Sequence, residues 1–459
     1  MTEIQRTENK MGVQPIGKLL VSMSLPPMVS MLVSAFYNIV DSIFVARISE
    51  EALASVTLVF PIQMIMVSIC VGIGVGLSSV ISRRLGAKRQ KDADSAAAHG
   101  FFLGFISWVF FALFGVFFAK PVLSLFTTDP AILDGAVVYA QIVSVGSIFS
   151  CFSICIERIL QSVGNMVYPM IFNMTGAIIN TILAPIFIIG YFGIPGYGIA
   201  GGGFVAVFGQ FVAFVIAVYL FRKKDPGVTI SFKGFKPQKK TIRDILTVAI
   251  PTVIMMAIFP LLVAMLNKIL ITYSATAVAV LGIYFRIQSL ITMPVIGINQ
   301  GALPLIGYNF GAQNRQRLVA TLQMALKASI IIMAAGTAIF WIFPHNIMLL
   351  FSAKGEMLTL GVSALRLVSV GFLGAAVVII LIGFFQAVAH AAFATIISLV
   401  RQLIVILPLA YVFTKYFGVY KFWWAYPIAE YVALIMALIF FRKIYRDEIS
   451  RMPDGDPVT

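Results

Sequence analysis

The sequence predicts an all-α polytopic membrane protein with twelve transmembrane helices, arranged as two pseudo-symmetric six-helix bundles around a central cleft. Hydrophobic residues make up 60% of the 459 residues and charged residues only 11%, whereas a soluble domain usually carries about 25% charged residues. Apolar runs of about 20 residues recur along the chain, and each is long enough to cross a hydrocarbon core of roughly 30 Å. The two halves of the chain also resemble each other at a fixed spacing.

Twelve apolar runs qualify as membrane spans. They are expected near 20–46, 53–82, 96–119, 135–158, 166–191, 199–221, 245–273, 277–308, 321–343, 359–387, 392–416 and 422–441. The first fifteen residues are polar, and no short apolar core with a small-residue cleavage site follows them, so we expect no cleavable signal peptide.

The distribution of Lys and Arg predicts the orientation of these spans. Most of the 33 basic residues lie in the N-terminal segment, in the loop after the second span, in the segment 222–244 and after residue 441. Cytoplasmic loops retain Lys and Arg, so we expect a multi-pass protein of the cell membrane with both termini in the cytoplasm. The net charge of +15 then reflects topology and contact with the lipid bilayer, and we expect no nucleic-acid partner.

The second half of the chain repeats the first at one constant offset, without gaps. The matched positions are not common Leu or Val but spaced Pro, Gln and Gly residues. They include Pro26 with Pro251, Gln63 with Gln288, Gly72 with Gly297, Gly76 with Gly301, and Gln161 with Gln386. Six spans per half give the two halves the same orientation. We therefore expect a first lobe at 1–221, a cytoplasmic basic linker at 222–244, a second lobe at 245–441 and a cytoplasmic tail at 442–459.

One carboxylate, Asp41, stands in the middle of an apolar span. An ionised Asp at the centre of a bilayer costs from about 2.5 kcal/mol upward, so its side chain must face protein or water. Asn38, Tyr37 and Ser34 lie on the same helical face. This stripe indicates a functional site; the alternative is a polar seam that joins two helices.

Further charged residues occur within the predicted spans. The acids are Glu157 and Glu430, and the cations are Arg158, Lys268, Arg286, Lys327, Arg366 and Arg401. Glu157 is either part of an ion site or the partner of Arg158. For Lys327 we expect the side chain to reach the cytoplasmic surface, whereas a packing role is at least as good an interpretation for Arg286 and Arg401.

No motif of a soluble enzyme is present. The sequence has no Walker loop, no zinc-ligand spacing and no nucleophile elbow, and its three cysteines, Cys70, Cys151 and Cys155, all lie in apolar runs. We therefore expect a protein that is not an enzyme, that carries no cofactor, and that uses an ion gradient as its energy source.

Four motifs resemble the MATE (multidrug and toxic compound extrusion) transporters, most closely their MepA-like and DinF-like prokaryotic branch. These motifs are SLPPMVSMLVSAFYNIVDSIFVA at 24–46, GLSSVISRRLGAKR at 76–89, MPVIGINQGALPLIGYNFGAQN at 293–314 and FFQAVAHAAFATIISLVRQL at 384–403. The resemblance covers nearly the whole chain. It implies two six-helix lobes around a central cleft, and efflux of amphipathic, mostly cationic compounds in exchange for H⁺ or Na⁺.

The resemblance also implies roles for individual residues. Asp41 falls on the cation-coupling acid of the first helix, preceded by Tyr37 and Asn38, and Asn180 falls on an amide of the same network. Pro26 falls on the proline at which the first helix is proposed to bend.

Four positions depart from the pattern of the relatives, and one of them is Lys268, which stands where Asn is common. Ala184 and Ala206 stand where related chains carry an acid and a Thr, which would leave a Na⁺ site at Asp41 and Asn180 short of oxygen ligands. Glu157 stands where relatives carry an Asn, and it can replace the missing carboxylate. We therefore favour H⁺ over Na⁺ as the coupling ion, and no metal site is certain.

The leading interpretation is a secondary antiporter that works by alternating access as a monomer. The side chains expected to line its substrate cleft are Tyr37, Gln63, Tyr139, Gln161, Lys268, Arg286 and Gln288. The alternative is a flippase or exporter of lipid-linked or anionic amphipathic substrates, because the second half carries intramembrane cations. An ion channel is disfavoured because no repeated filter-like segment is present.

Overall fold

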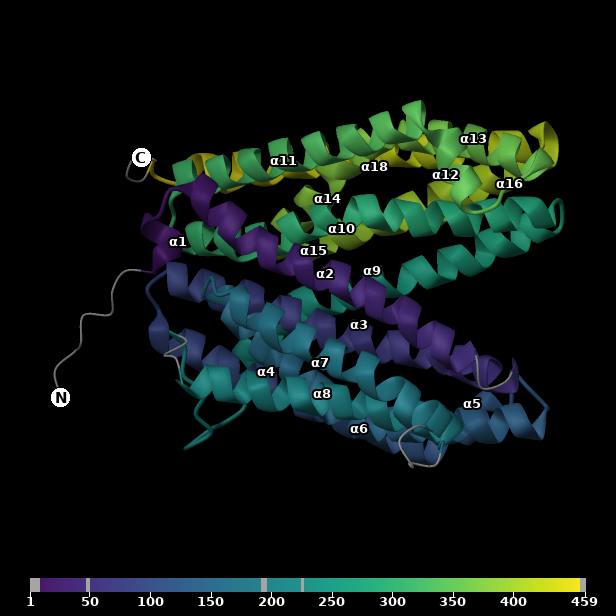
Figure 1. The fold of residues 1–459 in the computed structure, drawn as a ribbon. Coiled ribbons are helices and arrows are strands. Elements are labelled where there is room, and N and C mark those ends of the chain that lie inside the picture. The colour runs from purple at the N-terminus through teal and green to yellow at the C-terminus, as the bar shows by residue number, and fades with distance from the viewer. Residues whose placement is uncertain (1–8, 47–49, 191–195, 224–226, 455–459) are drawn as a thin grey trace. The chain divides into compact units, whose positions relative to one another are not determined.

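The computed structural model of this chain describes residues 9–46, 50–190, 196–223 and 227–454, without the side chains of residues 35–50, Leu53 and Ile189. Every regular element in these ranges is a helix (Figure 1). Eleven helices are long and apolar enough to cross a membrane, and a twelfth span results when a pair of helices bent by 50° is taken as one. The prediction of an all-α chain with twelve spans is confirmed for the part of the chain described.

The chain divides into two compact units. Unit 1 comprises Met1–Met28 and Ile254–Thr459, and unit 2 comprises Val29–Val253. Both boundaries fall within a helix: one in α2 (Ile16–Ala46) and the other in α9 (Lys239–Ile271). The two boundaries lie at matched positions of the sequence repeat, just after Pro26 and just after Pro251. Unit 1 therefore contains the N-terminal part of α2 and the C-terminal part of α9, and unit 2 contains the other two parts.

Unit 2 contains four long helices that pack against one another and a shorter one that closes the bundle. Its elements after α2 are α3 (Glu50–Gly86), α4 (Gln90–Leu113), the π-helix Phe114–Phe118, α5 (Ala119–Leu123), α6 (Pro130–Ser162), α7 (Val167–Pro185), the π-helix Ile186–Gly190 and α8 (Gly198–Lys223). Helix α6 contacts α3, α4 and α8, and α7 packs on α8. Small residues on α4, such as Ala93 and Ala97, are fully buried, which allows these close contacts.

Unit 1 holds the remaining spans. Its elements are α1 (Lys10–Val13), α10 (Ala275–Gly311), α11 (Arg315–Ile342), α12 (Pro344–Leu350), α13 (Gly355–Ser369), α14 (Phe372–Ala387), α15 (Ala391–Leu399), the π-helix Val400–Ile406, α16 (Leu407–Phe417), α17 (Val419–Phe422), α18 (Ala425–Asp447) and the 3₁₀ turn Ile449–Arg451. Helices α10, α11 and α18 surround α14, whose Ile380, Phe384 and Phe385 are fully buried.

Glycines allow α9 to lie directly against α3 within unit 2. A Cβ atom at Gly72 would lie 2.9 Å from the carbonyl oxygen of Ala249, and one at Gly76 would overlap the carbonyl oxygen of Ile245. In unit 1 the matched glycines, Gly297 and Gly301, let α10 lie directly against α2. Only glycine lets two helix backbones approach this closely.

The described part of the basic linker is attached to unit 2 rather than free. The backbone N–H of Thr229 donates to Asp94 Oδ1 over 2.8 Å, and that of Gln238 donates to His99 Nε2 over 2.7 Å. The ring of Phe235 packs against the ring of His99. The sequence predicts only a basic linker here. The structure shows that side chains of α4 hold its backbone.

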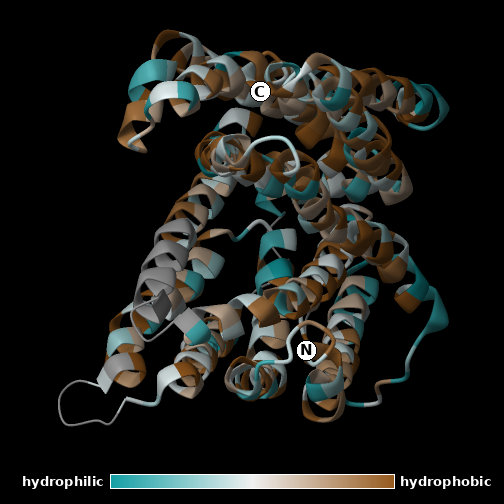
Figure 2. Ribbon diagram, turned by 90° about the vertical axis from the view of Figure 1, so that its right-hand side faces the viewer, coloured by the Kyte–Doolittle hydropathy of each residue, from teal (hydrophilic) through white to brown (hydrophobic). Residues whose placement is uncertain are grey.

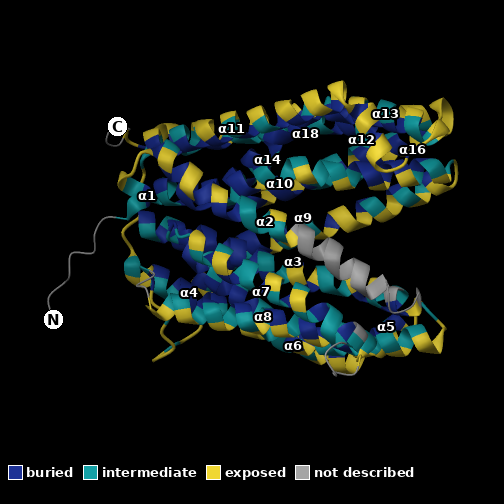
Figure 3. Cartoon of the chain, viewed as in Figure 1, coloured by how far each residue is buried: buried dark blue, intermediate teal, exposed yellow. Residues whose placement is uncertain are grey.

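Apolar side chains cover the outer surface of the helices. Phe105, Phe110 and Phe117 on one unit and Ile331 and Ile342 on the other are each about half exposed or more. Figure 2 shows apolar residues along the length of the helices, and Figure 3 shows exposed positions recurring along α11. Exposed apolar area of this kind suits contact with lipid.

Candidate ion and substrate site

Helix α2 carries the acid on which the sequence prediction depends. Asp41, Asn38 and Tyr37 lie within α2. The structure does not describe the side chains of these three residues. The helix passes through Pro26 and Pro27, both of them buried, without a break. A proline inside a helix donates no hydrogen bond and favours a kink. The predicted bend at Pro26 stays a prediction.

Asn180 lies on α7, one turn before a buried apolar cluster. The residue is 5% exposed, and Ala184, one turn later, belongs to a buried cluster with Ile188 and Val205. Helix α8 approaches so closely that a Cβ atom at Gly209 would lie 3.3 Å from the Cβ atom of Asn180. Ala184 and Val205 add no oxygen ligand for a hard cation beside this amide.

Glu157 is held by two side-chain amides in unit 2. Its Oε1 accepts a hydrogen bond of 2.9 Å from Gln161 Nε2, and its Oε2 accepts one of 3.1 Å from Asn173 Nδ2. Arg158 makes no direct ion pair with Glu157; its Nη1 donates instead to Gln161 Oε1 over 3.1 Å. The sequence left an ion pair with Arg158 open, and the structure shows that Gln161 bridges the two charges.

The Glu157 cluster and Asn180 occupy different levels of α7. Asn173 and Asn180 are two helical turns apart, which corresponds to about 10 Å along a helix axis. A single bound Na⁺ has ligands within about 2.5 Å. In this arrangement Glu157 lies beside Asn173, two turns away from the amide of the predicted coupling site.

Unit 1 contains a partly buried ion pair that could not be predicted from the sequence. Arg401 Nη1 donates to both carboxylate oxygens of Glu430 over 3.2 Å, and the two side chains are 20% and 13% exposed. Arg401 lies in the π-helix Val400–Ile406 of the eleventh span, and Glu430 lies on α18. A span boundary does not reveal which residues of two neighbouring helices face each other, so the pairing had no signal in the sequence.

Aromatic residues surround this ion pair. The ring centroid of Tyr284 lies 5.4 Å from that of Tyr426 and 6.4 Å from that of Trp423. Trp423 Nε1 and the Tyr426 hydroxyl have no hydrogen-bond partner among the described residues. Buried polar groups in native proteins are normally hydrogen-bonded, often to ordered water.

The predicted substrate-contacting residues fall into two sets. In unit 2, Tyr139 and Gln161 are buried and Gln63 is half-buried; the side chain of Tyr37 is not described. In unit 1, Lys268 and Arg286 are exposed. Gln288 is half-buried.

Comparison with known proteins identifies the family. The MatE family model matches residues 26–186 and 251–412, two segments that begin at the matched prolines of the sequence repeat. The chain belongs to the MatE family. Members of this family are transporters and not enzymes, which confirms the prediction that this chain is not an enzyme.

Curated MatE relatives align along nearly the whole chain. The multidrug export protein MepA of Staphylococcus haemolyticus is 25% identical over 424 residues, which are 92% of each chain. MepA of Staphylococcus aureus is 24% identical over 438 residues, which are 95% of each chain.

Solved structures of MatE transporters match the fold. A transporter of the MOP superfamily from Pyrococcus furiosus, described as having a binding pocket of reverse polarity, superposes with a TM-score of 0.88 at 26% identity. An outward-facing MATE multidrug resistance transporter superposes with a TM-score of 0.89 at 27% identity. In both cases the match covers 98% of this chain and 99% of the other chain.

Proposed function

We propose that this MatE transporter exports amphipathic, mainly cationic organic compounds across the cell membrane in exchange for a cation, with Asp41 as the coupling acid. The names of its MepA relatives support multidrug efflux. The position of Asp41 within the apolar helix α2 supports the coupling role. An ionised carboxylate inside a membrane span costs from about 2.5 kcal/mol upward, and such residues usually have a function. We propose that the transporter works as a monomer and that both of its termini lie in the cytoplasm.

The coupling site in this proposal consists of Asp41, Asn38, Tyr37 and Asn180, with Glu157 as a second carboxylate of the same unit. Alternating access would expose the site and the substrate cleft to each side of the membrane in turn. Competition then provides the exchange: cation binding at Asp41 neutralises the charge that attracts a cationic substrate. The lipid bilayer seals the apolar outer surface throughout the cycle.

We propose H⁺ rather than Na⁺ as the coupling ion. The buried apolar cluster of Ala184, Ile188 and Val205 beside Asn180 supports this choice. Na⁺ needs several oxygen ligands at once, whereas a proton needs only one carboxylate. No metal ion or other cofactor is required in this scheme.

The test is exchange in proteoliposomes that contain the purified chain. An imposed pH gradient should drive uptake of a cationic dye into the vesicles, and Asp41→Asn should abolish the driven uptake. The matched variant Asp134→Asn removes an exposed carboxylate near the beginning of α6 and should transport normally. Normal transport by Asp41→Asn would overturn the proposal.

A second candidate is export of anionic amphiphiles. The exposed cations Lys268 and Arg286 make no ion pair within the described residues, and unpaired cations on a membrane protein attract anions. The same vesicles, supplied with an anionic and a cationic dye of similar size, would separate the two candidates. Export of the anionic dye alone would favour the second candidate.

A further inference from the structure

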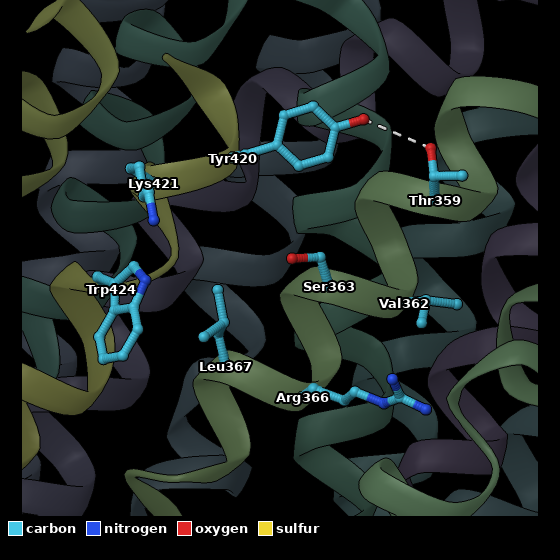
Figure 4. A pocket seen from close by; sticks show the side chains of 8 residues that line it. All are labelled: Thr359, Val362, Ser363, Arg366, Leu367, Tyr420, Lys421 and Trp424. Carbon is cyan, nitrogen blue, oxygen red and sulfur yellow. Dashed lines mark hydrogen bonds between the residues drawn. The ribbon is translucent and has the colours of Figure 1, made fainter. Parts of the chain in front are cut away.

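An open pocket of about 480 Å³ lies in unit 1 between α13 and the segment that joins α16 to α18 (Figure 4). Its lining residues are Thr359, Val362, Ser363, Arg366, Leu367, Tyr420, Lys421 and Trp424. The Arg366 guanidinium points away from Lys421 in Figure 4, so these two cations do not converge on one ligand. Unit 2 contains a more specific arrangement, in which two thiols meet inside the helix bundle.

Cys70 of α3 and Cys151 of α6 hold their sulfur atoms side by side. The two Sγ atoms are 2.7 Å apart, and both residues are free thiols. Cys70 is 7% exposed and Cys151 is 1% exposed. Cys70 lies near the middle of the span Ala54–Gly86, and Cys151 lies within the span Pro130–Ser162. The thiol pair is therefore buried inside the membrane-spanning part of unit 2.

The packing of α3 against α6 holds this thiol pair from both sides. Met66 and Gly74 of α3 lie one helical turn before and one turn after Cys70. The Ser144 hydroxyl of α6 lies 3.9 Å from Met66 Sδ. A Cβ atom at Gly74 would lie 3.1 Å from Ile154 Cγ2 of α6, so the missing side chain lets the two helices approach closely. The contact of the two sulfurs thus agrees with the contacts on either side of it.

Cys155 is buried but points toward a different helix. It lies one turn after Cys151 on α6, and its Sγ donates to the carbonyl oxygen of Gly100 on α4 over 3.5 Å. A Cβ atom at Gly104 of α4 would lie 3.1 Å from the same sulfur. The third thiol of the chain therefore serves as an internal control for the other two.

We propose that Cys70 and Cys151 form an oxidation site, which neutral two-electron oxidants convert to a disulfide between α3 and α6. A disulfide bond is about 2.05 Å long, so a small rotation of the two side chains brings the sulfurs to bonding distance. Charged oxidants enter a membrane span only at a high cost in free energy, so the site selects uncharged ones. This site does not depend on the proposed coupling ion or substrate.

Hydrogen peroxide is an oxidant of the required class. It converts one thiol to a sulfenic acid and leaves as water. The second thiol then attacks the sulfenic sulfur: the S–S bond forms, the S–O bond breaks, and a second water leaves. The two cysteines lose two electrons and two protons in total, and one peroxide molecule takes them up. Because the two cysteines are 81 positions apart, the disulfide closes a long loop and stabilises unit 2.

The test counts thiols in proteoliposomes that contain the reduced full chain. Diamide, a neutral azo compound that accepts two electrons and two protons, is added and removed. The chain is then denatured in N-ethylmaleimide, and its intact mass is measured. The untreated chain should carry three maleimide adducts, because its three cysteines are free, and the treated chain should carry one. Three adducts after treatment, or a disulfide that joins two chains, would overturn the proposal.

Two variants identify the partners in the disulfide. Cys155→Ala should carry two adducts before diamide and none after it. Cys70→Ser should carry two adducts both before and after diamide. Peptide mapping of the treated wild type should place the single adduct on Cys155. Loss of both adducts from Cys70→Ser would show that the oxidised pair does not include Cys70.

A charged oxidant tests the selectivity of the site. Tetrathionate is a dianion, and each oxidation rate in proteoliposomes is divided by the rate for the denatured chain to correct for intrinsic reactivity. This ratio should be about tenfold or more lower for tetrathionate than for diamide. Equal ratios would show that the thiols react from water, contrary to the proposal.

Thermal unfolding in detergent tests the effect on unit 2. The diamide-treated wild type should unfold several degrees above the reduced chain, and dithiothreitol should reverse this shift. Cys70→Ser, treated in the same way, should show no shift. Equal unfolding temperatures for the oxidised and reduced wild type would contradict the stabilising role of the disulfide.

Discussion

A Cβ atom at Gly301 of α10 would lie 2.9 Å from the carbonyl oxygen of Met23 in α2, so the two backbones are in direct contact. The contact has a counterpart at the matched position of the repeat, where Gly76 of α3 packs against Ile245 of α9. Pro26 and Pro251 follow these contacts in α2 and α9. The repeated glycines and prolines therefore mark the places where each of these helices passes from one unit to the other.

The first prediction concerns Gly301. Gly301→Ala places a methyl group against backbone atoms of α2 that cannot rotate away, so α2 and α10 must separate. We expect a loss of about 1–3 kcal/mol in stability, measured as a lower unfolding temperature in detergent. Gly282→Ala is the matched control on the same helix, since a Cβ atom there meets nothing within 4 Å. Equal unfolding temperatures for the two variants would contradict this account of the contact.

Much of the fold could be predicted from the sequence. Apolar run lengths predict up to twelve spans, and the glycines of the repeat do lie at close helix contacts. Contacts between helices distant in sequence could not be predicted. Nothing local in the sequence indicates that Arg401 pairs with Glu430, or that Gln161 separates Glu157 from Arg158. Which side chains meet depends on the rotation of each helix about its axis, and apolar composition does not fix that rotation.

The second prediction concerns the attachment of the N-terminal helix α1. Arg317 is 5% exposed, and its Nη2 donates to the carbonyl oxygens of Gln14 over 2.6 Å and Met11 over 3.2 Å. Arg317→Gln leaves these carbonyls without their donor, at a cost of about 1–3 kcal/mol. We expect faster hydrogen exchange at residues 10–14 and a lower unfolding temperature.

Arg315→Gln is the control for this attachment. Arg315 lies two residues earlier, is one-third exposed, and bonds to Tyr445 and Asp454 instead. Its replacement should leave exchange at residues 10–14 unchanged. If both variants accelerate exchange equally, the attachment of α1 does not depend on Arg317.

The third prediction is a double-mutant cycle on Arg401 and Glu430. Each single variant, Arg401→Gln or Glu430→Gln, leaves a partly buried charge without its partner, and we expect each to cost about 1–3 kcal/mol. The double variant removes both charges and should cost less than the sum of the two. Thermal unfolding in detergent measures the three variants. Arg446→Gln is the control, because its pair with Asp447 is largely exposed and contributes about 0–1 kcal/mol.

The last prediction concerns ion specificity and the role of Glu157. Its carboxylate accepts hydrogen bonds from Gln161 and Asn173, at a level of α7 about 10 Å from Asn180. If Asp41 alone carries the coupling ion, export should persist in Na⁺-free buffer under a pH gradient and should fail under a Na⁺ gradient at clamped pH. Glu157→Gln should lower the rate without changing which ion drives export. Na⁺-driven export that Glu157→Gln abolishes would assign the ion to a site at Glu157, because a bound Na⁺ requires the carboxylate oxygens that the amide lacks.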